Sequence, residues 1–488
     1  MNDFNGATND IDLGEDVIVA GQADVSHREN YIGKFKDRRL DKRAMRVSSM
    51  LYFNQSSSIH GSTQTEAEQK GAYRFLANKA VEEKILIAAT KERSGYLCAG
   101  KDLLVLTDTT EFNLKNHHNR LKPDTGIGVT GNNEDPGFFM HTSLVLDAAT
   151  ETVLGVSDVQ LWNRTEEGNV RMVKGENKRI PIEQKESYKW LLASNTSKAH
   201  LAAANSITMI EDREGDIYEQ FVRIPDHRTH LIIRNKTDRT LSNGHRLYEY
   251  LAAQDAAGSY TIDLVHGIDN RKGIEKRIAT VQVRYCKIKM KPPNHYKRKG
   301  IVAEIEMNAI EVREVTAGIK KPLLWRIVTT HSVESYEDAV GIVNKYRLRW
   351  YIEQLHRLMK KKGFGIESSE LETGWAIRKL TVMILNSSIR VMQLLLAVNN
   401  KESQPIEQVF DEQEIKCLEK LNNKLQGQTE KSKNNNDPKT LSWATWIIAK
   451  LGGWKGYNKA RPPGPIILKK GLDKFNFIFN GWKLALYG

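Results

Sequence analysis

The hydrophobic period of this chain changes from helical to strand-like and back, and that order limits the folds it can adopt. Helical spacing runs to about residue 93, and strand-like runs then fill residues 100–212 around one helical stretch, EQKESYKWLLAS. Mostly strand-like sequence continues to about residue 330, and helical spacing resumes at SYEDAV. This mixture favours the α/β class. We predict an α/β domain over residues 94–372, interrupted by a β-rich insertion at about 217–330.

Helical domains are predicted on both sides of the α/β domain. Residues 25–93 combine helical spacing with the basic run KFKDRRLDKRAMR. Residues 373–488 begin with a long apolar helical stretch and end in an aromatic tail, which indicates a surface for self-association. Residues 1–24 are acidic and lack periodicity, so we predict a disordered tail.

The net charge of +13 indicates a polyanionic partner. Nucleic acid is the commonest such partner, and an anionic membrane is the alternative. We favour nucleic acid because no amphipathic anchor or lipidation motif is present. No apolar run approaches about 18 residues, so we predict no membrane association. The three cysteines fit neither a disulfide framework nor a zinc cluster, so a cytoplasmic location is expected.

Three acidic residues stand where side chains from different elements can meet. Asp108 ends the predicted strand DLLVL, Asp212 ends the strand in NSITMIEDREGD, and Glu353 lies on the helical segment after the insertion. Carboxylates from strand ends and a packed helix form an all-oxygen site, which suits Mg²⁺ or Mn²⁺. Two such ions can promote phosphodiester cleavage. Taken singly, each acid is better explained by a turn cap, a solvated loop or a surface ion pair.

The segment YRLRWYIEQLHRLMKKKG places its one acid among cations on one helical face. Tyr346, Arg349, Glu353, His356 and Lys360 follow at steps of three and four residues, within a stripe about 80° wide. Arginine and lysine bind phosphate oxygens, and tyrosine can add a hydrogen bond. The stripe therefore predicts a metal-bound carboxylate beside groups that hold a phosphate. We assign no chemistry to His356.

Together these motifs resemble a known family. The spacing Tyr-(2)-Arg-(3)-Glu-(6)-Lys from Tyr346 to Lys360 is similar to the Y-R-E-K signature of bacterial DDE transposases of the insertion-sequence-four group, the branch that includes the transposon-five transposase. TDTT and DREGDIY resemble the group's two aspartate motifs, and GAYRFLAN resembles its N-terminal DNA-binding region. WRIVTTHSVES resembles the segment where the group's β insertion rejoins the α/β domain. The resemblance covers roughly residues 31–488.

The resemblance implies a ribonuclease-H-like catalytic core and cut-and-paste DNA transposition in a bacterial cytoplasm. Asp108, Asp212 and Glu353 would be the catalytic triad and would hold two Mg²⁺ ions, with Mn²⁺ as the alternative. Water would nick the DNA at the element's end, and the freed 3′-OH would attack the opposite strand to form a hairpin. Hairpin opening and strand transfer into target DNA would follow.

The resemblance also implies contacts to double-stranded DNA. Tyr346, Arg349 and Lys360 would hold phosphate of the non-transferred strand, and Trp325 would stack on a flipped base. Weaker correspondences add five cations: Arg234, Lys236, Arg38, Arg39 and Arg43. A core aromatic explains Trp325 equally well, and basic strand ends or solvated helices explain the other cations. The C-terminal helices would form a homodimer in the DNA complex.

Two other functions are compatible with parts of this sequence. A stand-alone nuclease of the same fold would need neither the β insertion nor the apolar tail. A DNA-binding regulator derived from a transposase would need no catalytic acids, yet all three acids and the Tyr-Arg-Lys set are present.

Overall fold

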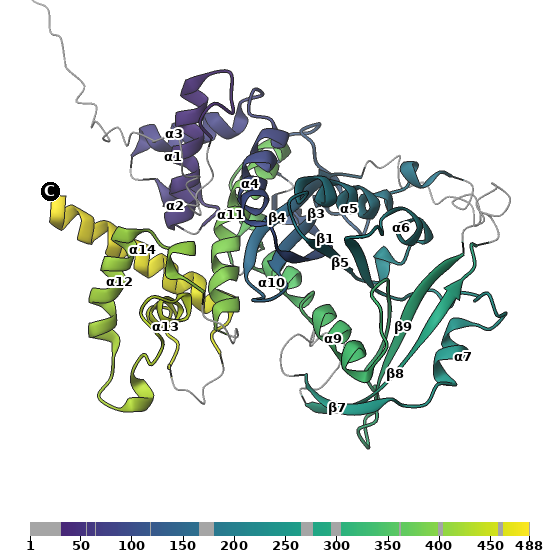
Figure 1. The fold of residues 1–488 in the computed structure, drawn as a ribbon. Helices are drawn as coiled ribbons and strands as arrows, with labels where there is room; N and C mark the ends of the chain where they lie inside the picture. The colour runs from purple at the N-terminus through teal and green to yellow at the C-terminus, as the bar shows by residue number, and fades with distance from the viewer. Residues whose placement is uncertain are drawn as a thin grey trace, which may run out of the picture.

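The computed structural model describes residues 31–487, apart from residues 55, 64, 118, 165–179, 265–276, 294–303, 361–362, 399–403 and 457–461. The tail predicted at residues 1–24 lies outside the described residues. In the described part of the chain, helices pack against a large sheet (Figure 1), with one hydrophobic core on each face of its central strands. The predicted mixed α/β class is confirmed.

A ten-stranded sheet runs through the described part of the chain in the order β2-β3-β1-β5-β6-β10-β9-β8-β7, with β4 paired to β3. β1 pairs in parallel with β5, and β5 in parallel with β6. The other strand pairs are antiparallel. The strands are β1 Asp102–Asn113, β2 Gly128–Val129, β3 Pro136–Asp147, β4 Val153–Trp162, β5 Ser206–Glu211, β6 Thr229–Arg234, β7 Gly258–Asp263, β8 Ile278–Met290, β9 Ile305–Glu314 and β10 Leu324–Thr329.

Both faces of the central strands are buried, which explains their nearly continuous apolar sequence. In β1, Leu104 and Leu106 belong to a core shared with the helices after the insertion. Leu103 and Val105 belong to a second core, formed with the helices between β4 and β7. The helices on this second side are α5 Tyr188–His200, α6 Tyr218–Arg223 and α7 Leu247–Ala252.

The strands after β6 extend the same sheet in antiparallel fashion. β10 pairs with β6, and β9, β8 and β7 follow outward in that order. Since β6 still pairs in parallel with β5, the antiparallel extension begins after β6. Figure 1 shows α7 beside β8 and β9 in this part of the molecule.

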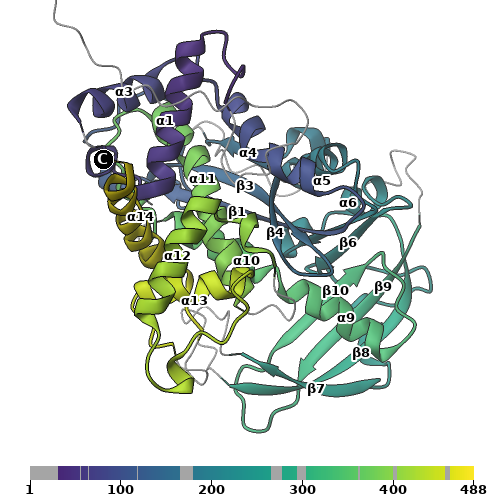
Figure 2. The same ribbon diagram turned by 60° about the vertical axis from the view of Figure 1, so that its left-hand side comes forward.

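Most of the remaining helices gather at the other end of the molecule, while α9, Tyr336–Arg347, packs against β8 and β6. α1 packs against both α11 and α14, so the N-terminal and C-terminal parts of the chain lie side by side (Figures 1 and 2). The side-chain amide of Asn476 donates to the Phe53 carbonyl oxygen at 2.7 Å, which ties α14 to α1. The helices other than α9 are α1 Arg38–Asn54, α2 Ile59–Ser62, α3 Glu66–Ala77, α4 Glu83–Leu97, α10 Trp350–Met359, α11 Gly374–Ala397, α12 Glu412–Leu425, α13 Leu441–Leu451 and α14 Pro465–Tyr487.

Helix α11 is the central helix of this bundle. An 18-residue window of this 24-residue helix has a mean hydropathy of 1.6, so α11 is long and apolar enough to cross a membrane by length and composition. In the described structure 94% of that window is buried, as in the core helix of a globular protein. α11 packs against α1, α3, α4, α10, α13 and α14.

Candidate active site

Asp108 lies within β1, so the prediction that the strand ends there is wrong. β1 continues to Asn113, and Asp108 is opposite Thr142 of β3. Threonine and phenylalanine favour extended backbone, and TDTTEF keeps pairing with β3. The parallel pairing with β5 does stop two residues earlier, at Leu106. Asp108 therefore lies just beyond the end of the parallel part of the sheet.

Asp212 directly follows β5, as predicted. Its carboxylate caps the short 3₁₀ helix Arg213–Gly215 and accepts a hydrogen bond from the Glu214 amide at 2.7 Å. The preceding acid, Glu211, is fully buried on the other side, where Gln220 donates to it at 2.6 Å. Burial raises the pKa of Glu211 well above its usual value. Of these two adjacent acids, only Asp212 can take part in a solvent-accessible site.

Glu353 stands in the first turn of α10, and the helix predicted around it is broken. α9 ends at Arg347, and the next two amides donate three residues back, Leu348 to Lys345 at 3.2 Å and Arg349 to Tyr346 at 3.1 Å. This is a 3₁₀ turn, which rotates α10 relative to α9. The single stripe over five residues is therefore wrong in detail, although Arg349 and Glu353 remain neighbours.

Lys360 also departs from the predicted stripe. α10 ends at Met359, and Lys360 has extended backbone angles, φ −80° and ψ −170°. Its ammonium group lies 5.9 Å from the centre of the Phe112 ring. The continuous helical register that would place it on the same face as Tyr346 is absent, so its role in holding phosphate stays a prediction without that geometric support.

Arg349 joins two of the predicted triad residues. Its Nη1 donates to Asp108 Oδ2 at 3.0 Å, and its Nη2 contacts Glu353 Oε1. Burial raises the pKa of Asp108 to about 6; Arg349 opposes the rise, while the charges of Asp212 and Glu353 add to it. Burial also acts to lower the pKa of Arg349, but the surrounding acidic groups raise it above its usual value. The three acids thus lie within electrostatic reach of one another.

The acidic centre fits a divalent metal in its chemistry but is not arranged around one. Among the described residues, no three or more His, Cys, Asp or Glu side chains are grouped closely enough to hold an ion. Three carboxylates are a suitable donor set for a hard cation such as Mg²⁺. The Arg349 guanidinium lies between Asp108 and Glu353, so it supplies the positive charge these carboxylates require.

Three predicted DNA-binding residues gather beside Arg349. Trp325 meets the Tyr346 ring edge-on at 5.8 Å, and Tyr346 is buried. Burial raises the pKa of the Tyr346 hydroxyl, and burial lowers the pKa of Arg234, with Tyr346 opposing that second shift. Lys236 is exposed on the loop after β6, where Asp216 accepts its backbone N–H at 2.8 Å. An aromatic and cationic cluster therefore adjoins the acidic centre.

The predicted N-terminal DNA contacts differ in their exposure. Arg38 and Arg39 are exposed on α1, and Arg39 pairs with Asp37 at 3.0 Å. Arg43 is only partly exposed and lies against α3, since a Cβ atom added at Gly71 would stand 1.8 Å from its Nη1. The glycine in GAYRFLAN therefore makes room for an arginine of the neighbouring helix.

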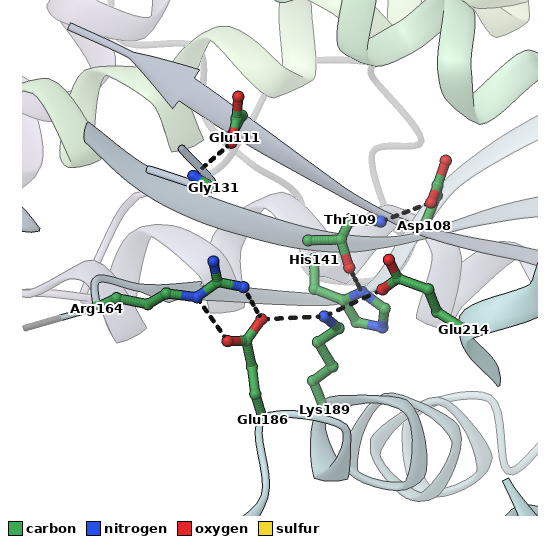
Figure 3. Close-up of polar contacts among 9 residues, drawn as sticks. All are labelled: Asp108, Thr109, Glu111, Gly131, His141, Arg164, Glu186, Lys189 and Glu214. Carbon is green, nitrogen blue, oxygen red and sulfur yellow. Dashed lines mark hydrogen bonds and ion pairs between the residues drawn. The ribbon is translucent and has the colours of Figure 1, made fainter. Parts of the chain in front are cut away.

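A polar network on the face of β1 opposite the Asp108 carboxylate was not assigned from the sequence. Asp108 accepts the Thr109 amide at 2.8 Å, and Thr109 Oγ1 lies 2.8 Å from His141 Nδ1 (Figure 3). On the same side, Lys189 lies 3.5 Å from Glu214, and its side chain is 10% exposed. Burial lowers the pKa of His141 well below its usual value. Lys189 falls in the segment KESYKW, and this segment is the sequence signal that could have identified the residue.

The fold and the site define a mixed α/β protein with an acidic, arginine-bridged centre near the end of its parallel strands. Residues 26–81 match the family model described as Transposase DNA-binding. That segment includes α1–α3 and the basic residues Arg38, Arg39 and Arg43. The match supports a DNA-binding protein of transposase type.

Among solved structures, the chain is similar to the piggyBac transposase in a cryo-EM structure of its synaptic complex with hairpin DNA. Sequence identity is 8%, the match covers 74% of this chain and 72% of that chain, and the TM-score is 0.32. Similarity of this degree carries no conclusion about the fold or activity of the present chain.

Proposed function

We propose that this chain is a cut-and-paste DNA transposase of the DDE type, related to the insertion-sequence-four group. The observation that carries the proposal is that Asp108, Asp212 and Glu353 come from three distant segments and lie within electrostatic reach of one another, beside a cationic and aromatic cluster. The match of residues 26–81 to a transposase DNA-binding domain supports the same function. The parallel strands β1, β5 and β6, with β3 antiparallel to β1, are in keeping with a ribonuclease-H-like core.

Asp108, Asp212 and Glu353 would hold two Mg²⁺ ions, or Mn²⁺ in their place. When bound, such ions supply activation of water and stabilisation of the leaving oxygen. Arg349 would release the two carboxylates and turn toward the phosphate, because a guanidinium binds phosphate oxygens in a fixed two-pronged geometry. The partly exposed side chain of Glu353 gives DNA access to this centre.

The chain's own residues would orient each step. In the first cleavage, a water oxygen bonds to phosphorus and the bond to the 3′ oxygen of the element's end breaks, which leaves a 3′-OH and a 5′-phosphate. That 3′-OH then bonds to a phosphorus of the opposite strand, whose bond to the 3′ oxygen of the flanking DNA breaks; this closes a hairpin and frees the flank with a 3′-OH. A second water bonds to the hairpin phosphorus and the element's 3′ oxygen leaves again as a 3′-OH. This 3′-OH finally bonds to a phosphorus of target DNA, whose bond to its own 3′ oxygen breaks. Tyr346 and Arg234 would hold the phosphate during these exchanges, and Trp325 would receive the extruded base.

Replacing Glu353 by glutamine tests the proposal, because the change keeps size and removes the carboxylate charge. We expect wild-type protein to cleave the DNA ends that flank its gene in the presence of Mg²⁺, and the Glu353→Gln variant to bind the same DNA without cleaving it. Glu337→Gln, an exposed acid on α9, is the matched control. Cleavage by Glu353→Gln at the wild-type rate would contradict the triad.

The same assay separates the two alternatives. Binding without cleavage by wild-type protein would favour a regulator derived from a transposase. Hydrolysis without hairpin formation or strand transfer would favour a stand-alone nuclease. We further propose that the protein acts in a bacterial cytoplasm, on double-stranded DNA, as a homodimer assembled through its C-terminal helices; a monomer on size exclusion with end DNA bound would contradict the dimer.

A further inference from the structure

A buried glutamate on the insertion side of the sheet is surrounded by arginines from three strands. Glu311 of β9 has no exposed surface, and Arg326 of β10 contacts it through Nε at 2.8 Å. Arg313 lies 3.1 Å away and Arg284 of β8 lies 3.9 Å away. Among the described residues these arginines form ion pairs with no other acid. One carboxylate against three guanidiniums leaves an excess of positive charge, and we call these four residues the arginine cluster.

The strand register explains why the cluster forms. Arg284 and Arg326 stand directly opposite Glu311 on the two neighbouring strands. Arg313 is two residues further along β9, so it lies on the same face. A fully buried carboxylate fixes the guanidinium positions in advance, which reduces the loss of side-chain entropy when an anion binds.

The cluster lies on the opposite face of the sheet from the candidate active site, at the same end of β10. Trp325 packs against Tyr346 on one face, and its neighbour Arg326 stacks over the Tyr248 ring of α7 at 3.9 Å on the other. The backbone carbonyl of Arg326 accepts the Asn235 amide at 2.7 Å, directly after Arg234. Cations therefore stand on both faces of one sheet end.

The exposed part of the cluster can accept a ligand. Arg313 is 44% exposed, and within the described residues only its Nε forms a hydrogen bond, to Glu311. Arg284 is 20% exposed and donates its Nε to the Gln254 carbonyl oxygen at 2.9 Å. Outward-facing guanidinium nitrogens held in fixed positions match the oxygens of phosphodiesters.

We propose that the arginine cluster is a second DNA-binding surface, which takes the phosphodiester backbone of duplex DNA on the face of the sheet remote from Tyr346 and Arg349. The inference rests on the proposed function for the identity of the polyanion. The duplex is either the DNA that flanks the element's end or the target DNA, and the backbone chemistry is the same in both.

The test measures how DNA affinity of the full chain depends on salt. Each phosphate contact contributes about 0.9 to the slope of log affinity against log salt. The double variant Arg284→Gln/Arg313→Gln removes two cations and leaves Glu311 paired with Arg326. We expect its slope to be smaller by about 1.8, so that wild-type protein loses about 12-fold more affinity than the variant between about 50 and 200 mM salt.

Two duplexes and two control variants make the result decisive. A changed slope on a duplex of unrelated sequence assigns the surface to target DNA, and a change only on end DNA assigns it to the flank. Arg313→Lys should keep the wild-type slope because the charge remains. Lys433→Gln removes one 41% exposed cation from the C-terminal part and should also keep it. If the double variant does not fold, the single variant Arg313→Gln should lower the slope by about 0.9.

Unchanged slopes on both duplexes, or an equal change in Lys433→Gln, would overturn the inference. Mg²⁺-dependent cleavage of end DNA by wild-type protein is measured in parallel. A lowered slope in the double variant without any wild-type cleavage would leave the second surface standing and contradict the proposed transposase.

Discussion

Replacing Arg349 by glutamine should weaken the fold and strengthen metal binding, because this residue carries the positive charge between Asp108 and Glu353. The Arg349 and Asp108 side chains are only 14% and 18% exposed. A hydrogen bond between such charged groups contributes about 1.5–3 kcal/mol. Glu353 is 38% exposed, and an ion pair of its i,i+4 type adds about 0.3–0.5 kcal/mol. We expect Arg349→Gln to lower the free energy of unfolding by about 2–3 kcal/mol without divalent ions.

Mg²⁺ should reverse this loss. An ion that binds only the folded state stabilises it by about 2.7 kcal/mol at a concentration 100-fold above its Kd. That gain is comparable to the loss caused by the substitution. Without the guanidinium, no positive charge between the carboxylates repels an incoming cation. Mg²⁺ should therefore raise the Tm of Arg349→Gln more than that of wild-type protein. Thermal unfolding in EDTA and in Mg²⁺ measures the difference, and calorimetric titration with Mn²⁺ measures binding directly.

Two controls limit the interpretation. Glu353→Gln removes one proposed ligand and should reduce the Mg²⁺ effect on Tm, whereas the remote variant Lys433→Gln should behave like wild-type protein. Equal stabilisation of wild-type protein and Arg349→Gln by Mg²⁺ would refute the idea that Arg349 occupies the place of a cation. Weaker Mn²⁺ binding by Arg349→Gln would refute it as well.

Three further predictions concern packing and recognition. Glu414→Ala should cost about 3–5 kcal/mol in urea unfolding, because it leaves the Arg390 guanidinium, paired at 2.9 Å and 1% exposed, buried without a counter-charge. Gly71→Ala should raise Tm modestly, since alanine favours helix by about 1 kcal/mol and the Arg43 guanidinium, 1.8 Å from the added Cβ, is the flexible end of a partly exposed side chain that can move away; a lowered Tm would show that Arg43 is held in place. Trp325→Ala should weaken binding of hairpin DNA about 5- to 150-fold. The fluorescence of 2-aminopurine at the extruded base should also be quenched less strongly by this variant than by wild-type protein, and Trp325→Phe should partly restore both effects.

Local sequence patterns were sufficient for much of the fold. The run around Phe138–Trp162 does form the hairpin β3–β4, and the long apolar stretch forms α11. Each pattern is complete within one segment, so no distant contact is needed to interpret it. The length of β1 could not be predicted in this way, because its second half is held by pairing with β3 some 30 residues away in the sequence, from Asp108↔Thr142 onward.

The break in the helix at Arg349 could not be predicted from the sequence either. Helical spacing from Tyr346 to Lys360 is regular, yet the chain turns through a 3₁₀ step and the helix ends at Met359. The bridge from Arg349 to Asp108 joins residues 241 positions apart, so no local pattern could indicate it. The match of residues 26–81 to a transposase DNA-binding domain agrees with the predicted class, while the roles of the individual site residues stay predictions.

Strand alternation nevertheless places the acids on one face by counting alone. In β1, Leu106 belongs to the core shared with α10, and Asp108 follows two residues later on the same face. In β5, Ile210 belongs to that core as well, and Asp212 follows with extended backbone. The same count puts Glu211 on the other face, where it is buried.

The count extends to the cations and to the second surface. Ile232 lies in the core shared with α10, so Arg234 shares a face with Asp212. Trp325 packs against Tyr346 on that face, and Arg326 must therefore face the opposite side, where it stacks on α7. A period of two residues thus separates the cations beside the acidic centre from the arginine cluster. A duplex bound at one group of cations cannot reach the other group through the sheet. Substitutions at Arg234 and substitutions in the arginine cluster should therefore change the salt dependence of DNA affinity independently.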